Sequence, residues 1–134
     1  MSLMQIFDIA GTAVSAQSQR LNTVASNIAN ADTAAAPGAQ PYRAKQVVFQ
    51  SVPVADSLGQ GVRVTQVTDD GAPARRIYDP RHPYADSEGH VSLSNVNVVE
   101  EMVNMIAASR SYQNNIETMN TAKSLLLKTL QLGS

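Results

Sequence analysis

The chain has 134 residues, a formal net charge of -1 and a sequence pI of about 6.0, and it contains no cysteine. The missing cysteines exclude disulfides and cysteine-ligated metals, and the near-neutral charge provides no field that attracts nucleic acid or an anionic membrane. No stretch approaches the roughly 18 apolar residues that a membrane span needs, so we expect no direct membrane span. The start, "MSLMQIFDIAG", lacks the basic region and long apolar core of a cleaved signal peptide.

Residues 3–31 are patterned as one long helix. Large apolar residues recur every seven positions, and a second series runs offset from them by three or four. The two series are Phe7, Val14, Leu21 and Ile28, and Leu3, Ala10, Gln17, Val24 and Ala31. The pattern predicts a helix roughly 43 Å long that packs along another helix. Gly11 either weakens its first turns or admits a close neighbour.

The outer face of this helix is neutral and polar. Residues 1–31 carry only two charges, Asp8 and Arg20, among many Ser, Thr, Asn and Gln side chains. Neutral amides and hydroxyls are buried at a lower cost than ions. We therefore expect neighbouring subunits to cover this helix. The alternative is that it covers the β-rich middle of a monomer.

Residues 32–95 hold all the prolines and most of the glycines. The runs "AKQVVFQSV" and "GVRVTQV" predict strands, and "RRIY" predicts a shorter one. "DDGAP" is typical of a turn, and the two prolines and the glycine of "DPRHPYADSEGH" predict a loop. This part is expected to form a small β-rich unit.

Residues 96–131 are helical again by pattern. Asn97 followed by Glu100 resembles a capping box, which places the helix start near Val98, and Gly133 suits its end. Its two apolar series are Val98, Met105, Tyr112, Met119 and Leu126, and Met102, Ser109, Ile116, Lys123 and Leu130. The fold prediction is mainly α: long N- and C-terminal helices paired as a coiled-coil-like hairpin (1–33 and 96–134), with a small β-rich middle domain (34–95).

The stretch "RLNTVASNIANADT" resembles the N-terminal motif of the axial proteins of the bacterial flagellum, which form its rod, hook and hook-associated parts. Asn27, Ile28, Ala29, Asn30 and Thr33 match that motif. The Pro-containing insertion before "QPYRAKQVVFQ" resembles the proximal rod members. So do "FDIAGTAVSAQSQRLN", "DPRHPYADSEGHV" and the segment from "NVNVVEEMVNM" to "LLLKTLQLG". Two departures are His90, where the family usually has Tyr, and Ser94, where it often has Pro.

The resemblance implies a structural component of the flagellar basal-body rod, in which the terminal helices pair and line the inner tube while the middle projects outward. It implies export without a cleaved signal peptide, and location in the periplasm-spanning rod. The implied partners are its own copies, the other proximal and distal rod proteins, and the export-gate adaptor at the rod base. A different class of function is a soluble helical adaptor or binding module that docks one partner.

The predicted assembly interface takes apolar positions from both helices, two motif asparagines and one arginine, which is expected to pair with a carboxylate such as Asp8 or Glu117. These residues are Leu3, Phe7, Val14, Leu21, Val24, Asn27, Ile28, Asn30, Val98, Met102, Met105, Arg110, Tyr112, Ile116, Met119, Leu126 and Leu130.

Enzymatic chemistry finds little support in the sequence. There is no Gly-rich phosphate loop, nucleophile elbow or Ser-His-Asp spacing. The segment Asp86 to Gly89 lacks the alternating ligands of a calcium loop, and His82 with His90 makes a poor zinc site. We expect no enzyme activity, cofactor, metal or small-molecule substrate, and no nucleic-acid partner.

Overall fold

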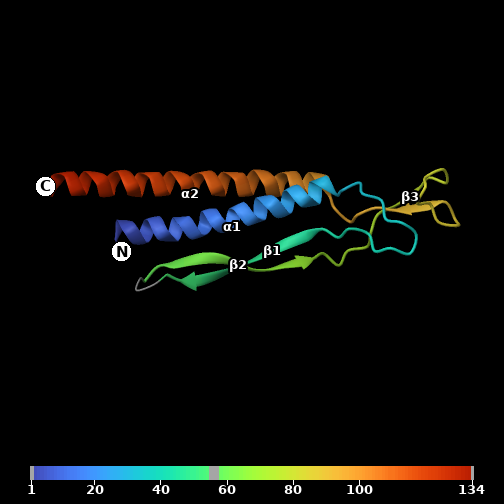
Figure 1. The fold of residues 1–134 in the computed structure, drawn as a ribbon, viewed down its shortest axis with the longest axis horizontal. Coiled ribbons are helices and arrows are strands. Elements are labelled where there is room, and N and C mark those ends of the chain that lie inside the picture. The colour runs from blue at the N-terminus through green and yellow to red at the C-terminus, as the bar shows by residue number, and fades with distance from the viewer. Residues whose placement is uncertain (1, 55–57, 134) are drawn as a thin grey trace.

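The computed structural model describes residues 2–54 and 58–133. It consists of two long antiparallel helices and two small antiparallel β-ribbons (Figure 1). Helix α1 spans Leu3–Ala29 and helix α2 spans Val98–Leu132. Strands β1 (Lys45–Pro53) and β2 (Gln60–Asp69) form the longer ribbon, and β3 (Arg76–Tyr78) pairs with β4 (His90–Ser92). The predicted fold class is confirmed.

Side chains at the predicted positions fix where both helices begin. Ser2 accepts a hydrogen bond from the Gln5 backbone amide, and the Gln5 side chain accepts one from the Ser2 amide, which completes a capping box. Asn97 accepts from the Glu100 amide, so α2 starts at Val98 as predicted, and Gly133 follows its last residue. The N-terminal helix ends at Ala29, two residues before its apolar pattern ends.

The strand prediction is right for three strands and wrong for the fourth. "DPRHPYADSEGH" was expected to be loop through His90, but His90–Ser92 pairs with Arg76–Tyr78. Three residues are too few to show an alternating pattern, so this strand had no periodic signal. The longer ribbon has a bulge after Val48, where Thr65 is an extra residue of β2 that has no residue opposite it on β1.

The three long elements lie in layers, with α1 between α2 and the β1–β2 ribbon (Figure 1). The ribbon therefore runs beside α1, while the β3–β4 ribbon lies beyond the end of the helix pair. A two-stranded ribbon is marginal alone, so its packing on α1 holds it in place. The side of α1 toward α2 is the helix pairing that was predicted, whereas its side toward the ribbon is covered by its own chain, as the monomer alternative expected, and not by another subunit.

Thr12 and Gly61 join the ribbon to α1. The Thr12 hydroxyl accepts a hydrogen bond from the Val62 amide at 3.1 Å and donates to the Ile9 carbonyl at 2.6 Å. A Cβ atom on Gly61 would lie 2.6 Å from Thr12 Oγ1. Glycine is needed here because the strand backbone lies directly against the helix side chain.

Replacing Gly61 by alanine is expected to lower the free energy of unfolding by about 1–2 kcal/mol, because the added methyl overpacks this contact. Urea unfolding followed by circular dichroism measures the loss. Thr12→Ala removes the atom that collides, so the Thr12→Ala/Gly61→Ala double variant should lose less than the sum of the single variants. A strictly additive double variant would contradict the direct contact.

The apolar core is small and composed mostly of alanine. The buried apolar residues among those described are Ala10, Ala16, Val24, Ala31, Ala44, Val91, Leu93, Val96, Ala108 and Ala122. Many larger apolar side chains are exposed, and more than half of these lie on α2. The chain therefore leaves more large apolar side chains in solvent than it buries, which is the reverse of an ordinary monomer.

Candidate assembly interface

The candidate residues of α1 mostly pack inside the subunit. Val24 is buried, and Leu3, Phe7, Val14, Leu21 and Ile28 are half-buried. Gly11 lies against the methyl group of Met119 on α2, where a Cβ atom would be 3.7 Å from that methyl. That distance is ordinary van der Waals contact, so an alanine would fit here and the packing against Met119 does not require glycine.

The face of α2 toward α1 is built from small or polar residues. Glu101, Ala108 and Ala122 are buried, and Asn115 is half-buried; these four positions follow a seven-residue spacing. Tyr112, Ile116, Met119 and Leu126 are half-buried beside them, as the predicted seam requires. Met102, Lys123 and Leu130 of the second predicted series are exposed, and of these Lys123 lines a groove together with Leu3 and Phe7 of α1.

The prediction assigned the contact between the helices to large side chains, and it does not hold near the two ends of α2, where Met102 and Leu130 are exposed. Alanine side chains allow two helices to approach closely, and here the larger Tyr112 and Met119 are half-buried beside the alanine positions. The signal that could have found the true seam is the seven-residue spacing of Glu101, Ala108, Asn115 and Ala122. Glu101, Ala108 and Ala122 are therefore packing residues that sequence reasoning missed.

A second apolar face lies on the far side of α2. Val99, Met102, Val103 and Ile106 follow helical spacing and are all exposed, Val99 by 72%. At about 100° of rotation per residue they point away from Ala108 and α1. We call these four residues the outer stripe. Val98 and Met105, both candidate residues, are exposed along its edge.

The end of α2 forms another apolar surface. The helix continues past the start of α1 (Figure 1), and Leu127, Leu130 and Leu132 are exposed near this end, Leu132 by 88%. We call residues 127–132 the C-terminal overhang. This end of α2 extends beyond Leu3, the first residue of α1. No described part of the chain therefore covers the leucines that follow Leu126 on the α1 side of the helix.

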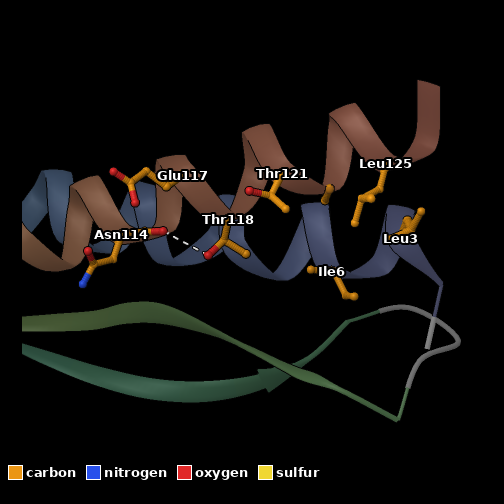
Figure 2. A pocket seen from close by; sticks show the side chains of 8 residues that line it. Leu3, Ile6, Asn114, Glu117, Thr118, Thr121 and Leu125 are labelled. Atoms are coloured by element: carbon orange, nitrogen blue, oxygen red, sulfur yellow. Dashed lines mark hydrogen bonds between the residues drawn. The ribbon is translucent and has the colours of Figure 1, made fainter. Parts of the chain in front are cut away.

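Open grooves flank the helix pair near this end. Figure 2 shows one of about 440 Å³, in which Leu3 and Ile6 of α1 face Thr118, Thr121 and Leu125 of α2. Asn114 and Glu117 continue its α2 wall, and the Thr118 hydroxyl donates to the Asn114 carbonyl at 3.0 Å. A mainly apolar groove on the other side is lined by Leu3, Met4, Phe7, Ala122, Lys123 and Leu126. These shallow, mixed walls suit side chains of an adjacent helix.

Asn27 is fully buried and joins three elements. Its Nδ2 donates to the Lys45 carbonyl at 2.8 Å and to the Glu101 carboxylate at 3.0 Å. Its Oδ1 accepts from the Tyr42 hydroxyl and from the Lys45 amide, each at 2.9 Å. The amide therefore uses its full hydrogen-bonding capacity inside the subunit, linking α1, the start of β1 and the start of α2.

Asn30 and Ser94 organise the chain after α1. Asn30 donates to the Ser26 carbonyl and accepts from the Thr33 hydroxyl. Ser94 donates to the Ala31 carbonyl at 2.6 Å and accepts from the Val96 amide. Ser94 therefore contributes two hydrogen bonds at this position. The motif asparagines lie in the internal architecture of the subunit, and their part in assembly remains a prediction.

Arg110 is exposed on α2, and no ion pair within residues 2–54 and 58–133 involves it. The expected pairing with Asp8 or Glu117 is therefore absent within the described subunit. The ion pairs shown are Lys45–Asp69, Arg75–Asp32 and Arg76–Asp86. The hydrogen bond and charge of Asp69 raise the pKa of Lys45 above its ordinary value.

Asp86 organises the loop between β3 and β4. Its carboxylate accepts hydrogen bonds from the amides of His90 and Glu88, both at 2.9 Å, and pairs with Arg76. The His90 amide, followed by the Glu88 amide and the Arg76 charge, holds the pKa of Asp86 below its ordinary value. The ionised form is therefore the one that the folded loop favours.

The pH dependence of this loop follows from that shift. Because the folded pKa is lowered, the stabilisation is complete above the ordinary aspartate value of about 3.9 and is lost as the pH falls through the folded value. The side-chain carboxyl carbon resonance of Asp86 should stay unchanged down to about pH 4 and move only in more acid solution. Nuclear magnetic resonance measures this, with Asp86→Ala as control. Movement centred near pH 5 would contradict the carboxylate's role.

Within residues 2–54 and 58–133, clusters of metal ligands and membrane-spanning helices are both absent. No group of three or more His, Cys, Asp or Glu side chains there is arranged to hold a metal ion. Within the same ranges, the helices lack the combined length and apolar character needed to cross a membrane.

The sequence is similar to those of known proteins over nearly its whole length. Residues 7–36 match the family described as "Flagella basal body rod protein", and residues 87–132 match "Flagellar basal body rod FlgEFG protein C-terminal". The chain is 62% identical to the flagellar basal-body rod protein FlgC of Yersinia enterocolitica. It is 56% identical to FlgC of Escherichia coli O6:H1 and 50% identical to FlgC of Buchnera aphidicola from Acyrthosiphon pisum. Each match covers 99% of both chains. The chain therefore belongs to the FlgC family of flagellar basal-body rod proteins.

Proposed function

We propose that this chain is a structural subunit of the bacterial flagellar basal-body rod and that it assembles through its terminal helices. In this proposal residues 1–33 and 96–134 form the helical part that lines the proximal tube, and residues 34–95 form the outer part. The interlocked helices make a stiff cylinder that transmits torque and surrounds the export channel. The proposal assigns the chain no catalytic role.

The uncovered apolar surface of α2 is the observation that carries this proposal. α2 has one face on α1, while its outer stripe and C-terminal overhang are exposed. Burying a large apolar side chain against a neighbour contributes roughly 1.5–3 kcal/mol at full burial, before the entropy of association is subtracted. A helix with two such surfaces is stabilised by neighbours on more than one side.

Family membership supports the partners and the location. Rod proteins assemble with other rod components in the basal body, so the proposed partners are further copies of this chain, the other proximal and distal rod proteins, and the export-gate adaptor at the rod base. The proposed route is export without removal of a signal peptide.

Val103→Glu tests the function, because this exposed residue contributes little to subunit folding but lies in the outer stripe. We expect the purified variant to keep its helicity, and bacteria that depend on it to export the chain yet form no complete rods and fail to swim. Swimming assays and electron microscopy of basal bodies provide the readouts.

The matched control is Gln66→Glu, which introduces the same charge at an exposed position of β2 and should swim normally. Normal rods and swimming with Val103→Glu would overturn the proposed role of α2. A purified chain that stays a fully helical monomer on concentration, and binds one non-rod protein, would favour the adaptor alternative.

A further inference from the structure

The β1–β2 ribbon rests on α1 near its two ends and is exposed between them. Within these two strands Gly61 alone is buried, and glycine has no side chain. Residues 48–51 of β1 and 65–67 of β2 are all exposed. Successive side chains of a strand point to opposite faces, so a run of exposed residues means that neither face of the ribbon is covered there. The ribbon is therefore held at separate places and not along its whole length.

The base of the ribbon is fixed by side chains from outside it. The buried Asn27 of α1 bonds to both backbone groups of Lys45, at 2.8 and 2.9 Å. Asn95, which lies just before α2, accepts from the Ala44 amide at 2.6 Å and donates to the Asp70 carbonyl at 3.1 Å. Two asparagines from other parts of the chain therefore hold both strands where the ribbon begins.

A β-bulge separates this base from the rest of the ribbon. Thr65 has no residue opposite it, which interrupts the ladder after Val48. We call residues 49–53 and 60–64, which lie beyond the bulge, the distal half. A bulge disrupts the ladder and bends its strand, and here both strands are exposed at the same level. The bulge is therefore the place where the ribbon can bend with the least loss of contacts.

A single hydrogen bond ties the distal half to α1 within the described residues. The Val62 amide donates to the Thr12 hydroxyl at 3.1 Å. Val52, Val62 and Val64 of the distal half are no more than half-buried. One neutral hydrogen bond contributes little net stability, because both groups bond to water when they separate. The distal half is therefore attached more weakly than the base.

The distal half covers an apolar side of α1. Ala16 follows Thr12 by one turn, so it lies on the side of the helix that bonds to Val62, and it is only 1% exposed. Ala10 is 4% exposed and lines an open groove of about 280 Å³ together with Gln60, the first residue of β2. Moving the distal half away would uncover these alanines without separating the two helices.

We propose that the distal half of the ribbon is a hinged strap, which lifts off α1 at the bulge when the Thr12–Val62 hydrogen bond breaks. The base, which the two asparagines hold, stays in place. Few buried contacts and an exposed ladder are typical of segments that open locally at a small free-energy cost. The docked strap closes the side of α1 that carries Ala10 and Ala16, and the lifted strap opens it. This inference goes beyond the proposed function and does not rest on it.

Thiol labelling of the purified full chain tests the strap, because the chain contains no cysteine of its own. The thiol of Ala16→Cys reacts only while it is uncovered, so its labelling rate follows the lifted population. Thr12→Val keeps the shape of the side chain but removes the hydroxyl that accepts from Val62. We expect Thr12→Val to speed this labelling about fivefold, which corresponds to one hydrogen bond of about 1 kcal/mol.

Two controls separate lifting of the strap from a general loss of stability. Ala108→Cys places the thiol at a fully buried position between α1 and α2, where labelling requires the helices to separate. Its rate should not change with Thr12→Val. Thr23→Val makes the same replacement elsewhere on α1, where the hydroxyl donates to the Gln19 carbonyl of its own helix. It should leave the labelling of Ala16→Cys unchanged.

The pattern of rates decides the proposal. An equal rise at the Ala16→Cys and Ala108→Cys thiols would mean that Thr12 stabilises the whole subunit, and it would overturn the strap. An unchanged rate for Ala16→Cys in the presence of Thr12→Val overturns it as well. Circular dichroism checks that each variant keeps its helices, and Ala10→Cys replaces Ala16→Cys if the latter does not fold. None of these results depends on rod assembly, so Val103→Glu tests the proposed function separately.

Discussion

Replacing Asn27 by leucine is expected to destabilise the subunit by at least about 3 kcal/mol, the largest loss predicted for any single substitution here. Leucine has nearly the same shape but no hydrogen-bonding group. The Glu101 carboxylate would lose a buried hydrogen bond, and the Tyr42 hydroxyl and both backbone groups of Lys45 would each lose a partly buried one. An unsatisfied buried group costs about 1–3 kcal/mol, and more if it is charged.

The measurement is urea unfolding of the purified chain, followed by circular dichroism. Asn30→Leu is the matched control, since Asn30 belongs to the same motif but bonds only to its neighbours Ser26 and Thr33 near the surface. Its expected loss is about 1 kcal/mol. Tyr42→Phe removes one of the four bonds of Asn27 and should fall between the two. Equal stability of the Asn27 and Asn30 variants would show that the buried network contributes little.

Much of the fold was predictable because it depends on local patterns. The heptad spacing of Phe7, Val14, Leu21 and Ile28 predicted α1, and Asn97 placed the start of α2 correctly. β-branched runs bounded by glycine and proline located three of the four strands. These features need only residues a few positions apart, so the sequence alone contains the information.

The position of the β1–β2 ribbon was not predictable in the same way. It depends on contacts such as Thr12 with Val62 and Asn27 with Lys45, between residues 50 and 18 positions apart. The motif identified Asn27 as a residue of interest, but its bond to Glu101 spans 74 positions. A polar residue on a helix gives no sign in sequence of which distant group it will bind.

The candidate interface was predicted in composition but not in orientation. Large apolar residues on α2 were assigned to a seam with α1, yet Met102 and Leu130 are exposed, and alanines occupy the seam. The exposed residues are thereby free to contact another subunit, which the assembly proposal requires. Side-chain size predicts burial in general, but whether an apolar residue is buried within its own subunit depends on how closely the helices approach.

Ala108→Leu tests that close approach. Ala108 is fully buried between α1 and α2. The larger side chain has no space there, so the helices must separate or the leucine must adopt a strained rotamer. The expected loss in the free energy of unfolding is about 2–3 kcal/mol, measured by urea unfolding.

The adjacent Ala107 provides the control for that substitution, because it is exposed on the same turn of α2. Ala107→Leu adds the same three carbon atoms with a similar helix propensity, and should change stability by less than about 0.5 kcal/mol. A difference between the two variants therefore measures packing against α1 and not the intrinsic effect of leucine in a helix. If they unfold at the same urea concentration, the alanine seam does not set the distance between the helices. The explanation for why Met102 and Leu130 face outward would then fail with it.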